Sequence, residues 1–134
     1  MIQLSTTTAQ TLSPGQSLTF NATLLKTGCA EAHRTSSSIV TLRSNCATYE
    51  LHFSGNVTST VAGPVSLAIT LDGEILPETL MNREISTANS SENIASAVLV
   101  RTTVGCCGKV SVTNAGTTPI VVSPNTSFFV KRVA

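Results

Sequence analysis

The feature that most constrains the fold is an alternation of apolar and polar residues between Tyr49 and Thr58. The apolar residues share one parity: Tyr49, Leu51, Phe53 and Val57. The polar residues share the other: Glu50, His52, Ser54, Asn56 and Thr58. A period of two is typical of a β-strand with one buried and one exposed face. Because this stretch holds the only Tyr of a chain without Trp, it predicts the central strand of a sheet core.

The composition is typical of a strand-rich domain with little surface charge. Its length of 134 residues predicts a single domain, residues 1–134, with one core. Charged residues make up 11% of the chain, well below the roughly 25% of an average soluble protein. A net charge of +1 produces little long-range field, so neither nucleic acid nor an anionic membrane is expected as a partner.

The start of the chain has neither the basic residues nor the apolar run of a secretory signal. No apolar stretch reaches the roughly 18 residues that a membrane span requires. We therefore expect cytoplasmic synthesis without a signal peptide and without membrane insertion. A location on a virion, a cell or a spore would then follow from lysis or from assembly into a particle.

Turn residues divide the first third of the chain into short segments. Ser-Pro-Gly at residues 13–15 favours a turn, and the alternation that follows predicts a strand from residue 18 to about residue 26. Residues 27–38 are polar and show neither the period of a strand nor that of a helix, so a loop is expected there. Residues 39–43 form a short apolar run before the central strand.

A tight hairpin is predicted after the central strand. Residues 65–71 alternate in the manner of a strand, and Asp72 and Gly73 follow at once. This dipeptide favours a type I′ turn, so residues 74–76 should fold back on the strand before them. Residues 78–93 are the least regular part, where we expect a surface loop, with a short helix as the alternative.

The next strand is apolar on both parities: Ile94, Val98 and Val100 on one, and Ala95, Ala97 and Leu99 on the other. A strand with two apolar faces needs a cover on its outer side. That cover is either another part of the same chain or a neighbouring subunit. Further short apolar segments close the chain, and about eight to ten strands spaced by turns predict an antiparallel β-sandwich or barrel.

The order of these segments resembles a known fold family over nearly the whole chain. The similar segments are residues 13–20, 49–55 and 67–74, the strands around Val98 and Val110, and residues 126–130. They resemble the jelly roll of tumour necrosis factor (TNF) and of the heads of complement-type collagens. They are also similar to the C-terminal domain of a collagen-like spore-surface glycoprotein of Bacillus and to small phage and prophage proteins of Firmicutes.

The resemblance implies an all-β, TNF-like jelly roll of about ten strands that forms a homotrimer around a three-fold axis. A neighbouring subunit would then supply the cover for the strand at residues 94–100. The candidate trimer-interface residues are Tyr49, Leu51, Phe53, Val98, Val100 and Phe128. The chain has no collagen Gly-X-Y stalk and few aromatic residues, which argues against receptor signalling.

Four cysteines are the densest chemical signal: Cys29, Cys46, Cys106 and Cys107. They could be small buried hydrophobes, or a disulfide could join Cys29 to Cys46 or to one of the adjacent pair. The candidate ligands for a zinc site are Cys29, His33, Cys106 and Cys107. Adjacent cysteines point to opposite sides of a strand and no Cys-x-x-Cys pair occurs, so we expect no metal and no cofactor.

No residue set points to catalysis. His52 lies on the polar parity of the central strand, which favours a surface or interface residue over a general base. The single Asp, Asp72, is explained by turn chemistry, and the sequence holds neither Gly-x-Ser-x-Gly nor a phosphate-binding loop. We therefore expect that the protein is not an enzyme.

The resulting hypothesis is a non-enzymatic, trimeric structural and adhesive module on a phage or prophage virion. It would serve as a head decoration, a fibre or a fibre tip, with carbohydrate as a candidate ligand and other virion or surface proteins as partners. The alternative is a ligand-binding trimer, intracellular or on a spore surface, whose cysteine-rich region forms the site, with a metal as one candidate ligand.

Overall fold

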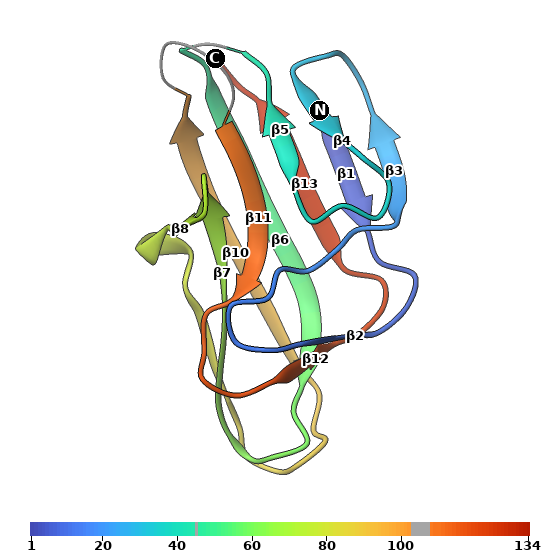
Figure 1. Cartoon of the computed structure of the whole chain (residues 1–134), viewed down its shortest axis with the longest axis vertical. Helices are drawn as coiled ribbons and strands as arrows, with labels where there is room; N and C mark the ends of the chain where they lie inside the picture. Colours follow the sequence, from blue (N-terminus) through green and yellow to red (C-terminus); the bar gives the residue numbers. More distant parts are fainter. Residues whose placement is uncertain (45, 103–107) are drawn as a thin grey trace.

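A computed structural model of the chain describes residues 1–44, 46–102 and 108–134. These residues form two antiparallel sheets (Figure 1). Sheet A contains seven strands: β1 (Ile2–Ser5), β2 (Gln10–Leu12), β3 (Ala22–Lys26), β6 (Thr48–Thr58), β10 (Glu92–Arg101), β12 (Ile120–Val122) and β13 (Ser127–Arg132). Sheet B contains six: β4 (Glu31–His33), β5 (Val40–Leu42), β7 (Gly63–Leu71), β8 (Glu74–Ile75), β9 (Met81–Ile85) and β11 (Gly108–Asn114). A 3₁₀ turn, η1 (Pro77–Thr79), follows β8.

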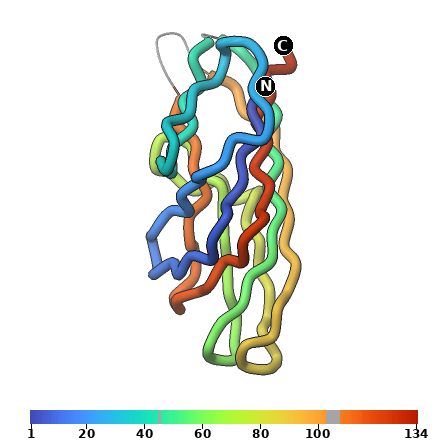
Figure 2. Tube along the Cα trace, turned by 90° about the vertical axis from the view of Figure 1, so that its right-hand side faces the viewer, coloured from blue at the N-terminus to red at the C-terminus, as the bar shows by residue number. Residues whose placement is uncertain are grey.

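The sheets lie face to face as two layers (Figure 2). Sheet A has the order β2-β12-β6-β13-β1-β3, and β10 pairs with the other side of β6. Sheet B has the order β4-β5-β11-β7-β8, and β9 also pairs with β7. The prediction of an all-β sandwich is confirmed. No helix among the described residues is long and apolar enough to cross a membrane.

Strand β6 is the centre of sheet A, as its alternation predicts. It is 11 residues long, and its buried and exposed residues alternate along nearly the whole strand. One side pairs with β10, from Thr48 opposite Arg101 to Val57 opposite Glu92. The other side pairs first with β13 and then with β12. This long strand is therefore the direct partner of β10, β12 and β13.

Aromatic side chains fill the space between the two sheets. Phe20 stacks on Phe128 with ring centroids 5.3 Å apart, and Phe53 meets Phe128 edge-on at 6.3 Å. Tyr49 is completely buried in the same core. Offset and edge-on pairs of this kind add to the stabilisation from burial alone.

The six candidate trimer-interface residues lie in this core or pack against it. Tyr49, Leu51, Phe53, Val100 and Phe128 are buried within the subunit, and Val98 is partly buried against them. The reason is that the apolar parity of β6 faces sheet B. Only the opposite parity reaches the surface of the subunit.

The predicted hairpin is confirmed. Asp72 and Gly73 have φ angles of 54° and 85°, the left-handed values that a type I′ turn requires. β8 pairs back onto β7, with Leu71 opposite Glu74. The Asp72 carboxylate also accepts a hydrogen bond from the backbone N–H of Lys109 at 3.0 Å, which ties the turn to β11.

Two predicted loops contain strands, and one predicted strand is shorter than expected. β4 lies within residues 27–38 and β9 within residues 78–93. β9 buries only its two ends, Met81 and Ile85, so its buried and exposed residues do not alternate as in a typical strand. The strand expected from residue 18 begins only at Ala22, although Leu18 and Phe20 are buried in the core.

Candidate interaction face

The outer side of β10 is apolar and uncovered within the subunit. Ile94, Val98 and Val100 face the core or its margin, whereas Ala95, Ala97 and Leu99 point outward. The Leu99 side chain is 64% exposed, among the most exposed large hydrophobic residues of the chain. The prediction of two apolar faces on this strand is confirmed, and the described part of the same chain does not cover the outer one.

Neighbouring strands extend this surface into what we call the sheet A face. In one row across the sheet, Phe129 of β13 is opposite His52 of β6, which is opposite Ala97 of β10. The rings of His52 and Phe129 meet edge-on at 5.7 Å. The sheet A face comprises the outward residues of three strands: Glu50, His52, Ser54, Ala95, Ala97, Leu99, Ser127 and Phe129.

A recess of about 320 Å³ opens on the sheet A face. Small side chains line most of it, and the full lining is His52, Phe53, Ser54, Ala95, Ser96, Ala97 and Ser127. Because alanine and serine do not reach far from the strands, the surface is hollowed beside the larger His52. The volume is large enough for a bulky side chain of another molecule.

The carboxylate of Glu50 and the ring of His52 contact each other beside this recess. Glu50 Oε1 lies 2.5 Å from His52 Nε2, and both side chains are substantially exposed. In the described part of the chain, no hydrogen bond joins His52 to a serine hydroxyl, so the geometry of a Ser-His-acid triad is not formed at this position. His52 therefore lies on the exposed side of the central strand, as its parity predicts.

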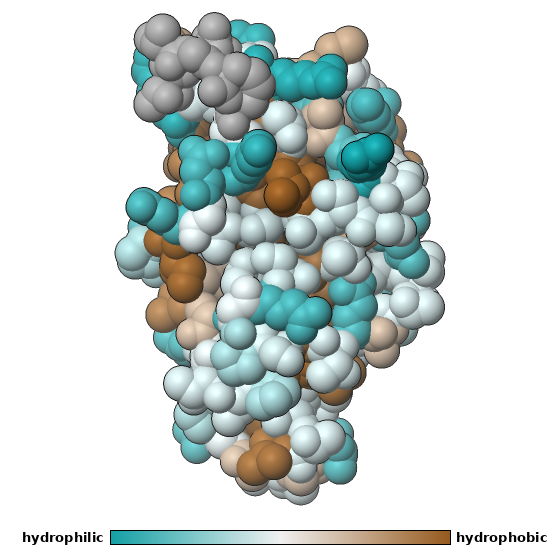
Figure 3. Space-filling view, viewed as in Figure 1, coloured by the Kyte–Doolittle hydropathy of each residue, from teal (hydrophilic) through white to brown (hydrophobic). Residues whose placement is uncertain are grey.

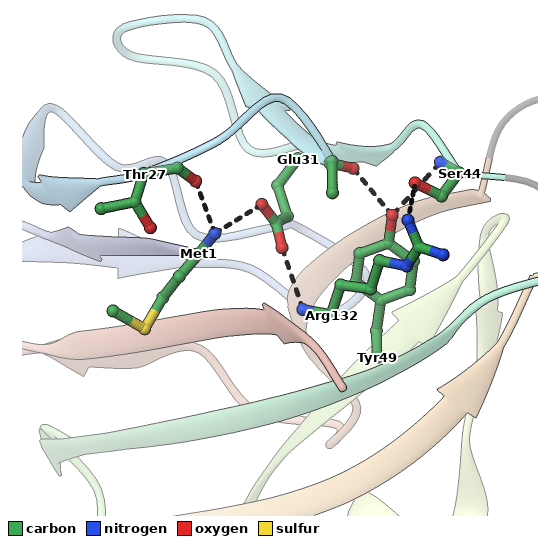
Figure 4. Close-up of polar contacts among 7 residues, drawn as sticks. Met1, Thr27, Glu31, Ser44, Tyr49 and Arg132 are labelled. Atoms are coloured by element: carbon green, nitrogen blue, oxygen red, sulfur yellow. Dashed lines mark hydrogen bonds and ion pairs between the residues drawn. The ribbon is translucent and has the colours of Figure 1, made fainter. Parts of the chain in front are cut away.

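A buried carboxylate ties the two sheets together (Figure 4), at the end of the sandwich where both chain termini lie (Figure 1). Glu31 of β4 has a side chain only 1% exposed. Its Oε2 pairs with the Met1 ammonium group at 2.8 Å, and its Oε1 accepts a hydrogen bond from the backbone N–H of Arg132 at 3.0 Å. β4 belongs to sheet B, while β1 and β13 belong to sheet A. This contact is structural, and no periodic pattern in the sequence predicts it.

The Tyr49 hydroxyl lies close to the Glu31 contact. It donates a hydrogen bond to the carbonyl of Ala30 at 2.8 Å and accepts one from the backbone N–H of Ser44 at 3.2 Å (Figure 4). Thus the one tyrosine of the chain packs its ring in the core and satisfies its hydroxyl at the sheet end.

Two of the alternatives predicted for the cysteines do not hold for Cys29 and Cys46. Cys29 and Cys46 are exposed and carry free thiols, so they are neither buried hydrophobes nor joined to each other. Cys106 and Cys107 lie outside the described residues. His33 hydrogen-bonds to the carbonyl of Ser37 through Nε2 at 2.9 Å. Within residues 1–44, 46–102 and 108–134, no three His, Cys, Asp or Glu side chains converge in a metal-binding group.

Comparisons with known proteins place the fold. Neither protein-family profiles nor curated sequences match this chain. Among solved structures, Eiger TNF from S. frugiperda matches with a TM-score of 0.78 at 9% identity, covering 99% of this chain and 91% of that one. The globular domain of zebrafish complement 1qA matches with a TM-score of 0.64 at 12% identity, covering 96% and 94%. The chain has a TNF-like jelly-roll fold.

A virion protein is also similar to this jelly roll. The PRD1 vertex protein P5 matches with a TM-score of 0.56 at 14% identity, covering 99% of this chain and 97% of that one. At such identities the likeness is one of fold alone. The resemblance drawn from the order of the sequence segments is therefore confirmed for the architecture, and the function has to be argued from the surface of the jelly roll.

Proposed function

We propose that the protein is a non-enzymatic structural and adhesive module that works as a homotrimer on the surface of a virion. It would act as a head decoration, a fibre or a fibre tip. The observation that carries the proposal is the exposed, apolar outer side of β10 beside the recess on the sheet A face. The similarity of the fold to a vertex protein supports the proposed location.

The sheet A face has the character of an interface. Its centre carries alanine, serine and aromatic side chains, and its one carboxylate, Glu50, already has a hydrogen-bond partner in His52. A fully buried interface core is depleted in charged residues in the same way. Leaving Leu99 and its neighbours in water would cost free energy that burial against another copy recovers.

A ring of three copies would use the face asymmetrically. In a cyclic trimer each subunit presents one surface to the preceding copy and a different surface to the next, so the contact closes without requiring self-complementarity. The recess at Ala95 and Ala97 would receive a side chain of the adjacent copy. Three subunits would cover the outer side of β10, which the described part of a single subunit leaves open.

Light scattering on the purified protein tests the oligomer. The expected mass is about three times the 13.9 kDa of one chain. Leu99→Asp places a charge in the proposed interface and should dissociate the trimer into single chains, because a buried unpaired carboxylate is strongly unfavourable. Val61→Asp is the matched control: Val61 is also 64% exposed, but it lies between β6 and β7, outside the sheet A face.

A single-chain mass for the unmodified protein would contradict the proposed trimer. So would a Val61→Asp variant that dissociates as completely as Leu99→Asp, because the effect would then not depend on the sheet A face. Mass spectrometry of purified virus particles tests the location separately. Particles that lack the protein would rule out the virion role while leaving the trimer intact.

The alternative, a ligand-binding trimer with a cysteine-rich site, rests largely on Cys106 and Cys107, which lie outside the described residues. Elemental analysis distinguishes the two hypotheses. Stoichiometric zinc in protein purified without a chelator would favour the alternative over the virion module.

A further inference from the structure

A basic hollow lies on the outer side of sheet B, away from the sheet A face. Its volume is about 510 Å³. Four cationic side chains from different segments line it: Lys26, Arg34, Arg43 and Lys109. They are half of the eight Lys and Arg residues of the chain, and the described lining contains no carboxylate. A chain with a net charge of only +1 therefore concentrates positive charge at one place.

Among residues 1–44, 46–102 and 108–134, no carboxylate forms an ion pair with any of these four cations. The carboxylates that contact basic groups in the described part of the chain are Glu31, Glu50 and Glu92, whose partners are the Met1 ammonium group, His52 and Arg83. The side chains at Lys26, Arg34, Arg43 and Lys109 are all exposed. Bringing four like charges together without counter-charges is unfavourable, and an anionic ligand would relieve that repulsion.

The register of sheet B explains the shape of the hollow. Lys109 of β11 is opposite Thr41 of β5, which is opposite Ala32 of β4. The two small side chains form a shallow floor beside the longer lysine. Ile39, 41% exposed, adds an apolar group to the same lining. Figure 3 looks onto this side of the molecule and shows an apolar group in its upper half bordered by hydrophilic groups.

A second recess, of about 490 Å³, adjoins the first and shares Ile39 and Lys109 with it. Its remaining lining is different in character: Ser17, Ser38, Asp72, Gly73 and Ser111. Hydroxyl groups and a carboxylate suit the hydroxyls of a neutral sugar, whereas the basic hollow suits a negatively charged group. The two recesses together form a groove in which the basic hollow can hold an anionic group and the serine-lined recess can hold a neutral one.

We propose that this groove binds an acidic polysaccharide, with a sulfate or carboxylate group held by Arg34 and Arg43 and a neighbouring sugar over the serine-lined recess. The inference deepens the adhesive role proposed above. Arginine is suited to such groups because its planar fork can donate two parallel hydrogen bonds to one oxyanion. Ile39 would pack against the C–H face of a sugar ring.

The lining argues against nucleic acid as the ligand. Proteins that hold single strands stack the bases on aromatic side chains. In the described lining of the two recesses the aromatic ring is His33, which meets the buried Phe20 edge-on and hydrogen-bonds to the carbonyl of Ser37. Because sheet B faces away from the sheet A face, a trimer built on the latter would display three such grooves. A long polysaccharide could occupy more than one of them, which raises its apparent affinity.

The test is binding to dextran sulfate, to polygalacturonate, which carries carboxylates, and to uncharged dextran, each also prepared as short oligomers. We expect binding to at least one charged polymer and none to dextran. The double variant Arg34→Gln with Arg43→Gln should bind the charged short oligomer about a hundredfold more weakly, because it removes two charge-assisted contacts that are each worth a factor of about ten. The double variant Arg83→Gln with Arg101→Gln removes the same charge outside the hollow and should bind within about twofold of the unmodified protein.

Several results would overturn the inference. These are binding of neither charged polymer, equal loss in the two double variants, or equal binding of a single-stranded oligonucleotide through Arg34 and Arg43. Light scattering on the same samples keeps this test separate from that of the trimer. Leu99→Asp should retain the affinity for a short oligomer and lose the additional affinity for a long polymer. A trimer that binds neither charged polymer would refute the ligand and leave the oligomer standing.

Discussion

The packing around Gly55 gives the sharpest test of how β6 meets β13. A Cβ added at Gly55 would lie 2.9 Å from Cγ2 of Thr126 and 3.4 Å from its Cβ. Thr126 is buried, and its hydroxyl is 3.2 Å from that of Thr6, so rotation of the side chain would break a buried hydrogen bond. Gly55→Ala should therefore force an overpacked contact in the core.

The cost can be worked out from this contact. Overpacking of a well-packed core costs about 1–3 kcal/mol. Alanine leaves the unfolded chain less conformational freedom than glycine does, which stabilises the folded state by about 0.4–1 kcal/mol. We expect Gly55→Ala to lower the free energy of unfolding by about 1–2 kcal/mol on these two terms. Thr126→Ser removes the opposing methyl group, keeps the hydroxyl, and should cost about 1 kcal/mol alone.

The two changes should compensate each other. In the double variant the alanine methyl occupies the space that the threonine methyl leaves, so the total cost should fall below about 0.5 kcal/mol and the coupling should be about 2 kcal/mol. Gly108→Ala is the control, because among the described residues the nearest atom to its Cβ would be 3.4 Å away. It should be additive with Thr126→Ser.

Urea unfolding followed by circular dichroism measures these free energies in a chain without Trp. The protein concentration must be the same for every variant, since the stability of an oligomer depends on it. If the costs of Gly55→Ala and Thr126→Ser simply add, the two side chains do not compete for one space. The described packing of β6 against the segment before β13 would then be wrong.

Two further changes test contacts that hold the sandwich together. Glu31→Gln should lower the free energy of unfolding by about 2–4 kcal/mol, because it leaves the Met1 ammonium group without its buried counter-charge. Glu50→Gln, in the exposed pair with His52, should cost less than about 1 kcal/mol, and equal losses would contradict the structural role of Glu31. Gly73→Ala should cost about 1–2 kcal/mol because of its φ angle of 85°, and a stability unchanged in urea unfolding would contradict the type I′ turn.

Local pattern predicted those parts of the fold that depend on neighbouring residues. The alternation of β6 predicted which of its side chains are buried, and the Asp72–Gly73 turn predicted the β7–β8 hairpin. The apolar outer side of β10 was also foreseen, as a strand that needs a cover. Each of these is a property of a few consecutive residues, so sequence alone carries the signal.

The sites depended on contacts between distant residues. Phe129, His52 and Ala97 form one row only because the registers of two strand pairs bring them together. The interface candidates chosen from sequence were core residues, since parity identifies the apolar side of a strand without stating which side a second sheet covers. Lys26, Arg34, Arg43 and Lys109 converge for the same reason: strand pairing, rather than spacing along the chain, decides which side chains share a surface.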